Sequence, residues 1–228
     1  MKTIGLVGGM SWESTGHYYR AVNQDVAKRL GGLHSAPMIV HSVDFAPIAA
    51  MQSAGDWAGA GRVLAEAARG LERAGAQVLG LATNTMHIVA QPIIEAVGIP
   101  FVHIADPTAD ALLADGFRTV GLLGTRFTME MPFYRERLEA RGLQVLVPDV
   151  DRTNLNAIIF EELCLGLVRE PSRQVYVDAI ARLAARGAEA VILGCTEIGM
   201  LIDDAHSPLP VYDTTELHAK ALVDAALA

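Results

Sequence analysis

Residues 73–83 read Arg-Ala-Gly-Ala-Gln-Val-Leu-Gly-Leu-Ala-Thr, and residues 185–195 read Ala-Arg-Gly-Ala-Glu-Ala-Val-Ile-Leu-Gly-Cys. Aligned on Gly75 and Gly187, the two stretches end together at Thr83 and Cys195. A second match, earlier in each half, pairs the run 3–8 with the run 119–124. The chain is therefore predicted to be a large duplication. Two halves that each offer one hydroxyl or thiol from the same structural position indicate a site with two facing groups.

Short apolar runs, rich in Val, Ile and Leu, alternate with longer amphipathic stretches. The runs predicted to be strands are Thr3–Val7, Pro37–Val43, Val78–Leu81, Pro100–Ile104, Thr119–Leu123, Gln144–Val147, Ala190–Leu193 and Leu209–Tyr212. Continuous apolar runs are typical of parallel strands that are covered on both faces. The stretches between them have helical spacing, as in the sets Leu64, Ala67, Ala68, Leu71 and Val177, Ile180, Leu183.

Strand–helix alternation predicts an α/β protein with parallel sheets. Eight strands in two matching sets favour two similar αβα domains, each with a four-stranded parallel sheet. The first domain is predicted to comprise 1–102 plus 208–228 and to carry Thr83, and the second to comprise 103–207 and to carry Cys195. Gly75, Gly142 and Gly187 suit helix ends. The stretch 215–227 is predicted to be a last helix that packs back on the first half.

Composition narrows the range of partners. The chain has 228 residues, 51% of them apolar and 19% charged, as in an ordinary soluble globular protein. A net charge of −8 without a Lys/Arg cluster argues against nucleic acid or an anionic membrane as partner. No apolar run approaches the roughly 18 residues that span a bilayer, and no signal-peptide pattern begins the sequence. With only two cysteines, we expect a reduced, cytoplasmic enzyme.

Four segments lie at predicted strand ends, where open parallel sheets bind ligands: 8–11, 83–85, 125–128 and 195–197. They are dense in small and hydroxyl residues, which leave helix-starting N–H groups free to hold a carboxylate. If the halves face each other, all four segments converge on one cleft. The candidate substrate-binding residues from these segments are Met10, Ser11, Asn84, Thr85, Thr125, Thr196 and Glu197.

Other interpretations of the first and second segments remain open. The glycines at 5, 8 and 9 are wrongly spaced for a dinucleotide loop, and no P-loop lysine follows, so we favour a tight turn that opens a helix at 11–15. Thr83, Asn84 and Thr85 could each be a helix cap. His87 is placed on the first turn of a helix and His103 at a strand end that could reach the cleft. The seven histidines form no metal-binding pattern, so no metal site is predicted.

The two cysteines are expected to differ. Cys195 follows a buried strand and precedes a predicted helix, whose amino terminus would lower the pKa of its thiol. The alternative for Cys195, and our interpretation of Cys164 in the apolar stretch 158–167, is an inert buried thiol. Adjacent Glu161 and Glu162 lie in a predicted helix over 154–167; solvent exposure is expected for one, and a role in the cleft stays open for the other.

Three motifs resemble the aspartate/glutamate racemase family over nearly the full length: Gly8–Thr15, Thr83–His87 and the highly specific Gly194-Cys195-Thr196-Glu197-Ile198-Gly199. The first-half motif of this family is usually Cys-Asn-Thr, so Thr83 stands where a catalytic cysteine normally stands. The chain looks most similar to a subgroup of broad-specificity or L-Asp/Glu-specific racemases with the same Thr/Cys pair. The resemblance implies halves related by a pseudo-twofold axis, an interdomain site, a homodimer, no cofactor, and two-base Cα proton transfer by Thr83 and Cys195 to invert an amino acid.

Two departures from the family pattern have consequences. An aliphatic hydroxyl is a far weaker acid than a thiol. We therefore expect Cys195 to be the stronger base and Thr83 mainly a proton donor, with slow or directionally biased turnover. The stretches 44–52 and 160–166 lack the arginine and lysine with which some aspartate racemases hold carboxylates, which puts aspartate in doubt as the preferred substrate. Gln52 could bind a side-chain carboxylate or amide instead, and Arg126 could reach the cleft.

Two other functions fit the same residues. A decarboxylase or a cis-trans isomerase of the same superfamily would use Cys195 alone. A non-catalytic amino-acid-binding protein would use the two-lobed fold without chemistry, since fold alone does not decide function. The alignment of Thr83 with Cys195 in the two halves argues against a non-catalytic binding protein. No cofactor motif is visible, and direct two-base proton transfer requires none.

Overall fold

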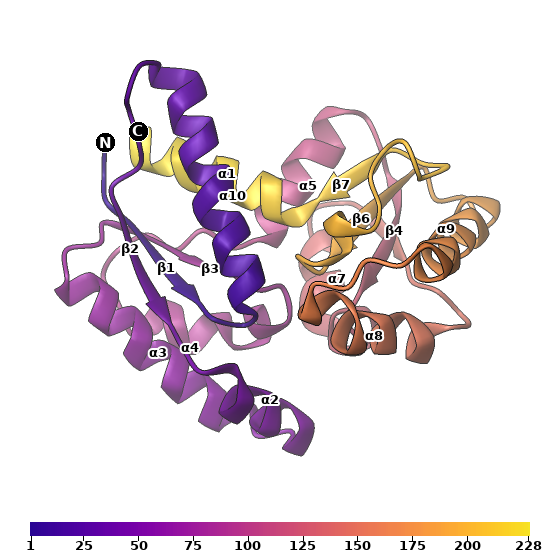
Figure 1. Ribbon diagram of the computed structural model, residues 1–228, viewed down its shortest axis with the longest axis horizontal. Helices are drawn as coiled ribbons and strands as arrows, with labels where there is room; N and C mark the ends of the chain where they lie inside the picture. Colours follow the sequence, from indigo (N-terminus) through magenta and orange to yellow (C-terminus); the bar gives the residue numbers. More distant parts are fainter. The chain divides into compact units, whose positions relative to one another are not determined.

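The computed structural model describes residues 1–228 and contains two separate parallel sheets (Figure 1). The first is three-stranded, in the order β2 (Met38–Ser42), β1 (Ile4–Gly8), β3 (Val78–Leu81). The second is four-stranded, in the order β5 (Gln144–Leu146), β4 (Thr119–Gly124), β6 (Ala190–Gly194), β7 (Val211–Asp213). The chain divides into a first compact unit, 1–104 with 218–228, and a second, 105–217. The predicted α/β class with two similar halves is confirmed.

Helices connect the strands in each unit. Those of the first unit are α1 (Trp12–Leu30), α2 (Phe45–Ala54), α3 (Trp57–Arg73), α4 (Ala90–Glu95) and the 3-10 turn η1 (Thr85–Val89). Those of the second are α5 (Ala105–Ala114), α6 (Arg126–Glu130), α7 (Pro132–Glu139), α8 (Arg152–Glu161), α9 (Glu170–Ala185) and the 3-10 turns η2 (Leu163–Leu165) and η3 (Ile198–Met200). The last helix, α10 (Thr214–Leu227), begins in the second unit and ends in the first.

The duplication extends to individual hydrogen bonds. Gly75 and Gly187 end α3 and α9 with φ of 101° and 98°. Just beyond, Ala76 N–H donates to the Leu71 carbonyl at 3.0 Å, and Ala188 N–H donates to the Leu183 carbonyl at 3.0 Å. This is the Schellman arrangement, and it needs a left-handed residue that glycine supplies without steric cost. The predicted helix ends at Gly75, Gly142 and Gly187 are therefore confirmed.

The first sheet is covered on both faces. Alternation along β1 sends Val7 to one face, against Leu64 and other side chains of α3, and Ile4 and Leu6 to the other. On that second face α10 contributes Leu222 and packs against α1, as Figure 1 shows for the indigo and yellow helices. The predicted return of the last helix to the first half is confirmed. Full burial of each such leucine stabilises the fold by roughly 1.5–3 kcal/mol.

The core of the second unit lies between its sheet and the helices α8 and α9. Leu123 of β4 and Leu193 of β6 pack there with Ile180 and Leu183. The predicted helical stripes are buried, with one adjustment: in α9, Tyr176 and Ala179 complete the buried face, and Val177 is only half-buried. Cys195 lies in this same cluster, so the site residue rests on the core.

One predicted strand is reduced to a single bridge. Leu79 N–H donates to the Pro100 carbonyl at 2.8 Å, and Val102 N–H donates to the Leu79 carbonyl at 2.9 Å, so that only Phe101 pairs with β3. The ladder stops because Pro100 has no N–H and because the chain turns into α5 at Ala105. The expectation of a four-stranded sheet in the first half is therefore wrong: the sheet has three strands, and Phe101 adds only an isolated bridge.

Two predicted boundaries also differ. The range 208–228 is predicted to belong to the first domain, whereas β7 pairs with β6 and the second unit extends to 217. The boundary falls inside α10, because the apolar run before it completes a sheet. The helix predicted over 154–167 ends at Glu161, and the turn η2 follows it before Gly166 in the left-handed region.

None of the helices combines the length and the apolar character needed to cross a bilayer.

Candidate functional site

The loop after β1 is a tight turn that opens α1. Ser11 caps the helix, accepting from Ser14 N–H at 3.4 Å, and Gly9 N–H donates to Thr15 Oγ1 at 2.7 Å. Gly9 has φ of 95°, and a Cβ there would lie 2.2 Å from the Val43 carbonyl oxygen, so only glycine fits. Met10 and Ser11 are buried. The predicted turn is confirmed, with α1 beginning at Trp12.

The loop after β4 repeats this device in the second unit. Thr125 caps α6, accepting from Thr128 N–H at 3.3 Å, and the two hydroxyls lie 3.2 Å apart. Arg126 has an exposed side chain whose guanidinium lies 5.5 Å from the Phe127 ring centroid. Two strand ends thus present capped helix starts, whose N–H groups favour anions.

Thr83 follows β3 and is 7% exposed. Val7 pairs with Leu81 and Leu123 pairs with Leu193, so Thr83 and Cys195 stand the same distance beyond equivalent rungs. Thr83 N–H donates to the Leu81 carbonyl at 2.9 Å, and its own carbonyl lies 2.7 Å from His87 Nδ1.

The alternative interpretation of the Thr83–Thr85 segment as helix caps is not supported by the cap geometry. Asn84 occupies the cap position of η1, but its side chain makes no capping hydrogen bond. Asn84 and Thr85 are both buried. The hydroxyl of Thr83 makes no hydrogen bond within its own unit.

Gln52 is buried on α2 and donates from Nε2 to Met86 Sδ at 2.9 Å. Met86 belongs to η1, so this contact joins α2 to the turn that follows Thr83. Asp44 caps α2 by accepting from Ala46 N–H at 3.2 Å. Within the first unit, the structure therefore brings Gln52 to the turn that follows Thr83, and its role in substrate binding stays a prediction.

In the second unit, one carboxylate oxygen joins two neighbours. Cys195 Sγ donates to Glu197 Oε2 at 3.0 Å, and Thr196 Oγ1 donates to the same oxygen at 2.6 Å. All three side chains are buried, with Cys195 7% exposed. Burial and the adjacent negative charge of Glu197 raise the pKa of the Cys195 thiol well above its ordinary value. The resting residue is the thiol, hydrogen-bonded to the Glu197 side chain.

The expectation of a lowered thiol pKa at Cys195 is wrong. It assumed a helix starting just after the cysteine, but only the three-residue turn η3 follows. Such a turn has no appreciable dipole, and the nearest charge is negative. The sequence does show a carboxylate, Glu197, two residues after Cys195. It does not show that this carboxylate contacts the thiol.

Sequence reasoning missed the position of Cys164. This thiol is half-buried rather than buried, and burial together with the nearby Glu197 carboxylate raises its pKa to about 12. It packs against the same core cluster as Cys195. Because Cys164 is far from Glu197 in sequence, no local pattern could have revealed this. The interpretation of Cys164 as an unreactive thiol agrees with this raised pKa.

Glu161 and Glu162 lie outside this cluster. Glu161 is exposed, as expected for one of the pair. Glu162 accepts from Ser172 Oγ at 2.6 Å and pairs with Arg169 at 3.4 Å. These contacts give Glu162 a structural role in joining η2 to α9.

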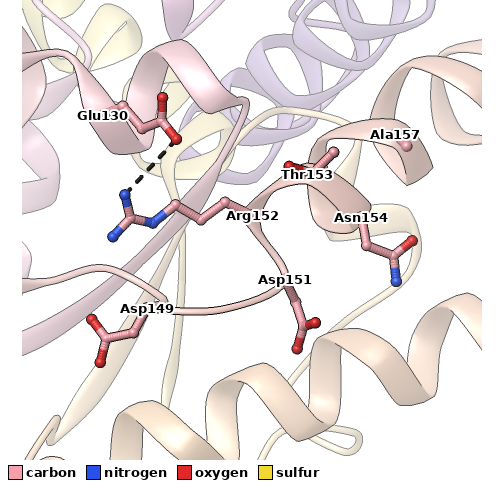
Figure 2. Close-up of a pocket in the computed structure, with 7 residues that line it drawn as sticks. All are labelled: Glu130, Asp149, Asp151, Arg152, Thr153, Asn154 and Ala157. Carbon is pink, nitrogen blue, oxygen red and sulfur yellow. Dashed lines mark ion pairs between the residues drawn. The ribbon is translucent and has the colours of Figure 1, made fainter.

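A separate hollow of about 720 Å³ lies on the second unit (Figure 2). Its carboxylates are paired with arginines: Glu130 with Arg152 at 3.8 Å, Asp151 with Arg182 at 2.6 Å and Asp149 with Arg186 at 3.0 Å. No residue of the four strand-end segments lines it. It is thus distinct from the candidate site.

The fold and these loops define a class: an α/β protein of two equivalent units, each with one proton-carrying side chain at the same strand end. Comparison with known proteins then identifies the family. The model for the Asp/Glu/hydantoin racemases matches residues 7–222. The chain belongs to this family of amino-acid racemases.

The chain is similar to three characterised or solved relatives. A Yersinia pestis protein solved as a candidate Asp/Glu racemase is 51% identical, with full coverage of both chains and a TM-score of 0.93. An aspartate racemase homologue from Pyrococcus horikoshii is 36% identical, again with full coverage of both, and its TM-score is 0.87. The broad-specificity amino-acid racemase RacX of Bacillus subtilis is 25% identical over 162 residues, 69% of this chain and 68% of RacX.

Proposed function

We propose that this protein interconverts the enantiomers of an amino acid without a cofactor, with Cys195 and Thr83 exchanging protons on opposite faces of Cα. The observation that carries the proposal is the equivalence of Thr83 and Cys195 in two matching sheets. Inversion through a planar carbanion needs one acid–base group on each face. A duplicated fold supplies two such groups, because each half carries one at the equivalent position.

Cys195 begins the reaction in one direction. Glu197 accepts the thiol proton over the 3.0 Å contact, and the resulting thiolate removes the Cα proton of the substrate. The carbanion then takes a proton from the Thr83 hydroxyl. Solvent returns a proton to Thr83, while Glu197 releases the one it holds, so the enzyme is regenerated with no net change. In the reverse direction Thr83 must act as the base, which is the harder task for a hydroxyl.

Substrate binding is assigned to the remaining loop residues. The capped helix starts at Ser11 and Thr125, with Met10, Asn84, Thr85 and Thr196, surround the α-carboxylate and amino groups. Gln52 contacts the side chain through neutral hydrogen bonds. Such bonds are weaker than a bidentate cation, so we expect a broad substrate range in which aspartate is not strongly favoured. The likeness to RacX, a broad-specificity racemase, supports this expectation.

The experiment is proton NMR in deuterated water with separate L and D forms of aspartate, glutamate and neutral amino acids. Loss of the Cα–H signal together with loss of optical rotation is the expected result, and it names the substrate. Cys195→Ala should abolish both. Cys164→Ala, which removes the neighbouring thiol, is the matched control and should keep activity. No change with any substrate would refute racemisation and favour the decarboxylase, isomerase or binding-protein alternatives.

A second candidate, chemistry by Cys195 alone, has one observation in its favour. Glu197 adjoins Cys195, whereas the Thr83 hydroxyl has no hydrogen-bonded carboxylate in its unit. Exchange of Cα–H with retained configuration would show that only the cysteine face works. The family resemblance also supports a homodimer, which analytical ultracentrifugation would test directly.

A further inference from the structure

A histidine lies directly beneath the Thr83 loop. His87 is 3% exposed, and its Nδ1 lies 2.7 Å from the Thr83 carbonyl oxygen. Its Nε2 accepts from the backbone N–H of Ile104 at 3.2 Å. A carbonyl can only accept, and a nitrogen that accepts an N–H carries no proton. His87 is therefore the neutral tautomer with its proton on Nδ1.

The ring joins two functionally different parts of the first unit. Thr83 is the candidate proton donor, and Ile104 is the last residue before the chain passes into the second unit. The chain returns at His218, whose Nε2 donates to the Val102 carbonyl at 2.8 Å. His87 packs edge-on against His103, with ring centroids 4.5 Å apart, and its ring lies 5.9 Å from that of His218. The two places where the chain leaves and re-enters the first unit, at Ile104 and His218, thus both lie next to the His87 ring.

The second unit provides an internal comparison. The residue that corresponds to His87 there is Gly199, four positions after Cys195. A Cβ at Gly199 would lie 2.3 Å from Asp213 Oδ2, so the Asp213 carboxylate already fills the space that a side chain at this position would need. The histidine therefore belongs only to the half that carries the hydroxyl. The duplication alone does not require it.

We propose that His87 is a positioning residue whose Nδ1–H clamps the Thr83 carbonyl to η1, and so holds the hydroxyl at the distance that proton delivery needs. The Ile104 N–H fixes the tautomer of the ring that makes this donation possible. The proposal rests on the proposed racemase function. A hydroxyl is a weaker acid than the thiol that usually occupies this position, so it depends more on close placement. A displacement of about 1 Å can reduce turnover by roughly 100-fold.

Two substitutions separate the two hydrogen bonds of the ring. The amide nitrogen of asparagine can replace Nδ1 and keep the bond to Thr83. The amide oxygen of glutamine can replace Nε2 and keep only the bond to Ile104. We expect His87→Asn to retain inversion to within a few-fold, and His87→Gln to lose about 10- to 100-fold, the scale of a misplaced reacting group.

Deuterium exchange at Cα distinguishes a positioning role from a general loss of stability. A general loss of stability would reduce exchange and inversion together. In His87→Gln we expect Cα exchange with retained configuration, which reports the Cys195 face, to persist while inversion falls. Equal loss of exchange and inversion, or no difference between the two variants, would overturn the positioning role.

Nitrogen NMR of the wild-type protein tests the clamp without any substrate. The ¹⁵N shifts of His87 should report a protonated Nδ1 and an unprotonated Nε2. The opposite tautomer would overturn the clamp even in an active enzyme. If the expected tautomer is found but no amino acid is inverted, the clamp stands and the proposed function fails, so the two failures are distinguishable.

Discussion

At the scale of single residues, the contact between Cys195 and Glu197 controls the ionisation of the thiol. A carboxylate 3.0 Å from a buried thiol both opposes ionisation and offers a destination for the proton. The same carboxylate makes the thiol a poor nucleophile toward external reagents, because it is the thiolate that reacts. Burial and this carboxylate thus keep Cys195 as the protonated thiol.

Replacing this carboxylate should therefore increase reactivity toward alkylating reagents. We expect Glu197→Gln, which keeps the side-chain shape, to lower the Cys195 pKa and to speed alkylation by iodoacetamide at pH 8, while racemisation falls. Wild-type alkylation should rise only well above the ordinary thiol range near pH 8.5, because the raised pKa keeps the thiol neutral below it. The measurement is the alkylation rate against pH in a Cys164→Ala background. Faster labelling of the wild type than of the variant would contradict this account.

Thr83 offers a second test. A cysteine at this position is several pKa units more acidic than a hydroxyl, so Thr83→Cys should raise turnover and reduce any difference between the L-to-D and D-to-L directions. Thr83→Ser is the matched control and should remain near the wild type, while Thr83→Ala should lose inversion. The measurement is the initial rate from each enantiomer by polarimetry. Unchanged or lower turnover in Thr83→Cys would argue against a proton-transfer role for Thr83.

At the scale of elements, the helix ends place the two strands that carry the site. Gly75 and Gly187 stop α3 and α9 in left-handed conformations, and β3 and β6 begin a few residues later. Thr83 lies two residues after the end of β3, and Cys195 directly follows β6. A shift at either helix end would propagate along the strand to Thr83 or Cys195.

Alanine substitutions should show this dependence. Gly187→Ala places a side chain at φ of 98° and should destabilise the protein by about 1 kcal/mol. Gly16→Ala is the matched control: Gly16 lies inside α1 with open space around a Cβ, so we expect stabilisation by about 0.5–1 kcal/mol. Urea unfolding gives both values. The same sign for both substitutions would mean that backbone conformation does not control these positions.

At the scale of the whole molecule, α10 is the element that belongs to both units. It starts where the second sheet ends and completes the core of the first. Leu222 on α10 fills the space beside Gly80, where a Cβ would lie 2.8 Å from its Cδ1. In the second unit, Leu183 on α9 fills the space beside Gly121 in the same way: a Cβ at Gly121 would lie 2.9 Å from Leu183 Cδ1.

These two leucines should destabilise different units when truncated. Leu222→Ala should cost roughly 2–5 kcal/mol and should mainly reduce hydrogen-exchange protection in β1 and β3. Leu183→Ala should cost a similar amount but mainly reduce protection in β4 and β6. Mass-spectrometric hydrogen exchange resolves the two patterns. Uniform loss across both sheets in each variant would show that the units unfold as one.

The sequence alone determined the duplication, the parallel α/β class and the equivalence of Thr83 and Cys195. These features are local: apolar runs, helical spacing and a glycine at a fixed offset are written along the chain, and matching patterns produce matching folds. The last helix and the turn at Ser11 follow from the same kinds of signal. The family resemblance rests on contiguous motifs for the same reason.

Only the tertiary structure decided the features that depend on residues distant in sequence. It reduced the run at Phe101 to one bridge, because Pro100 and the start of α5 leave no room for a ladder. It raised the pKa of Cys195 by burial and by the approach of a carboxylate, where local pattern had indicated a helix dipole. It brought Cys164 to Glu197 and Ile104 to His87. Burial, charge and hydrogen bonding act through space, so these contacts exist only once the chain has folded.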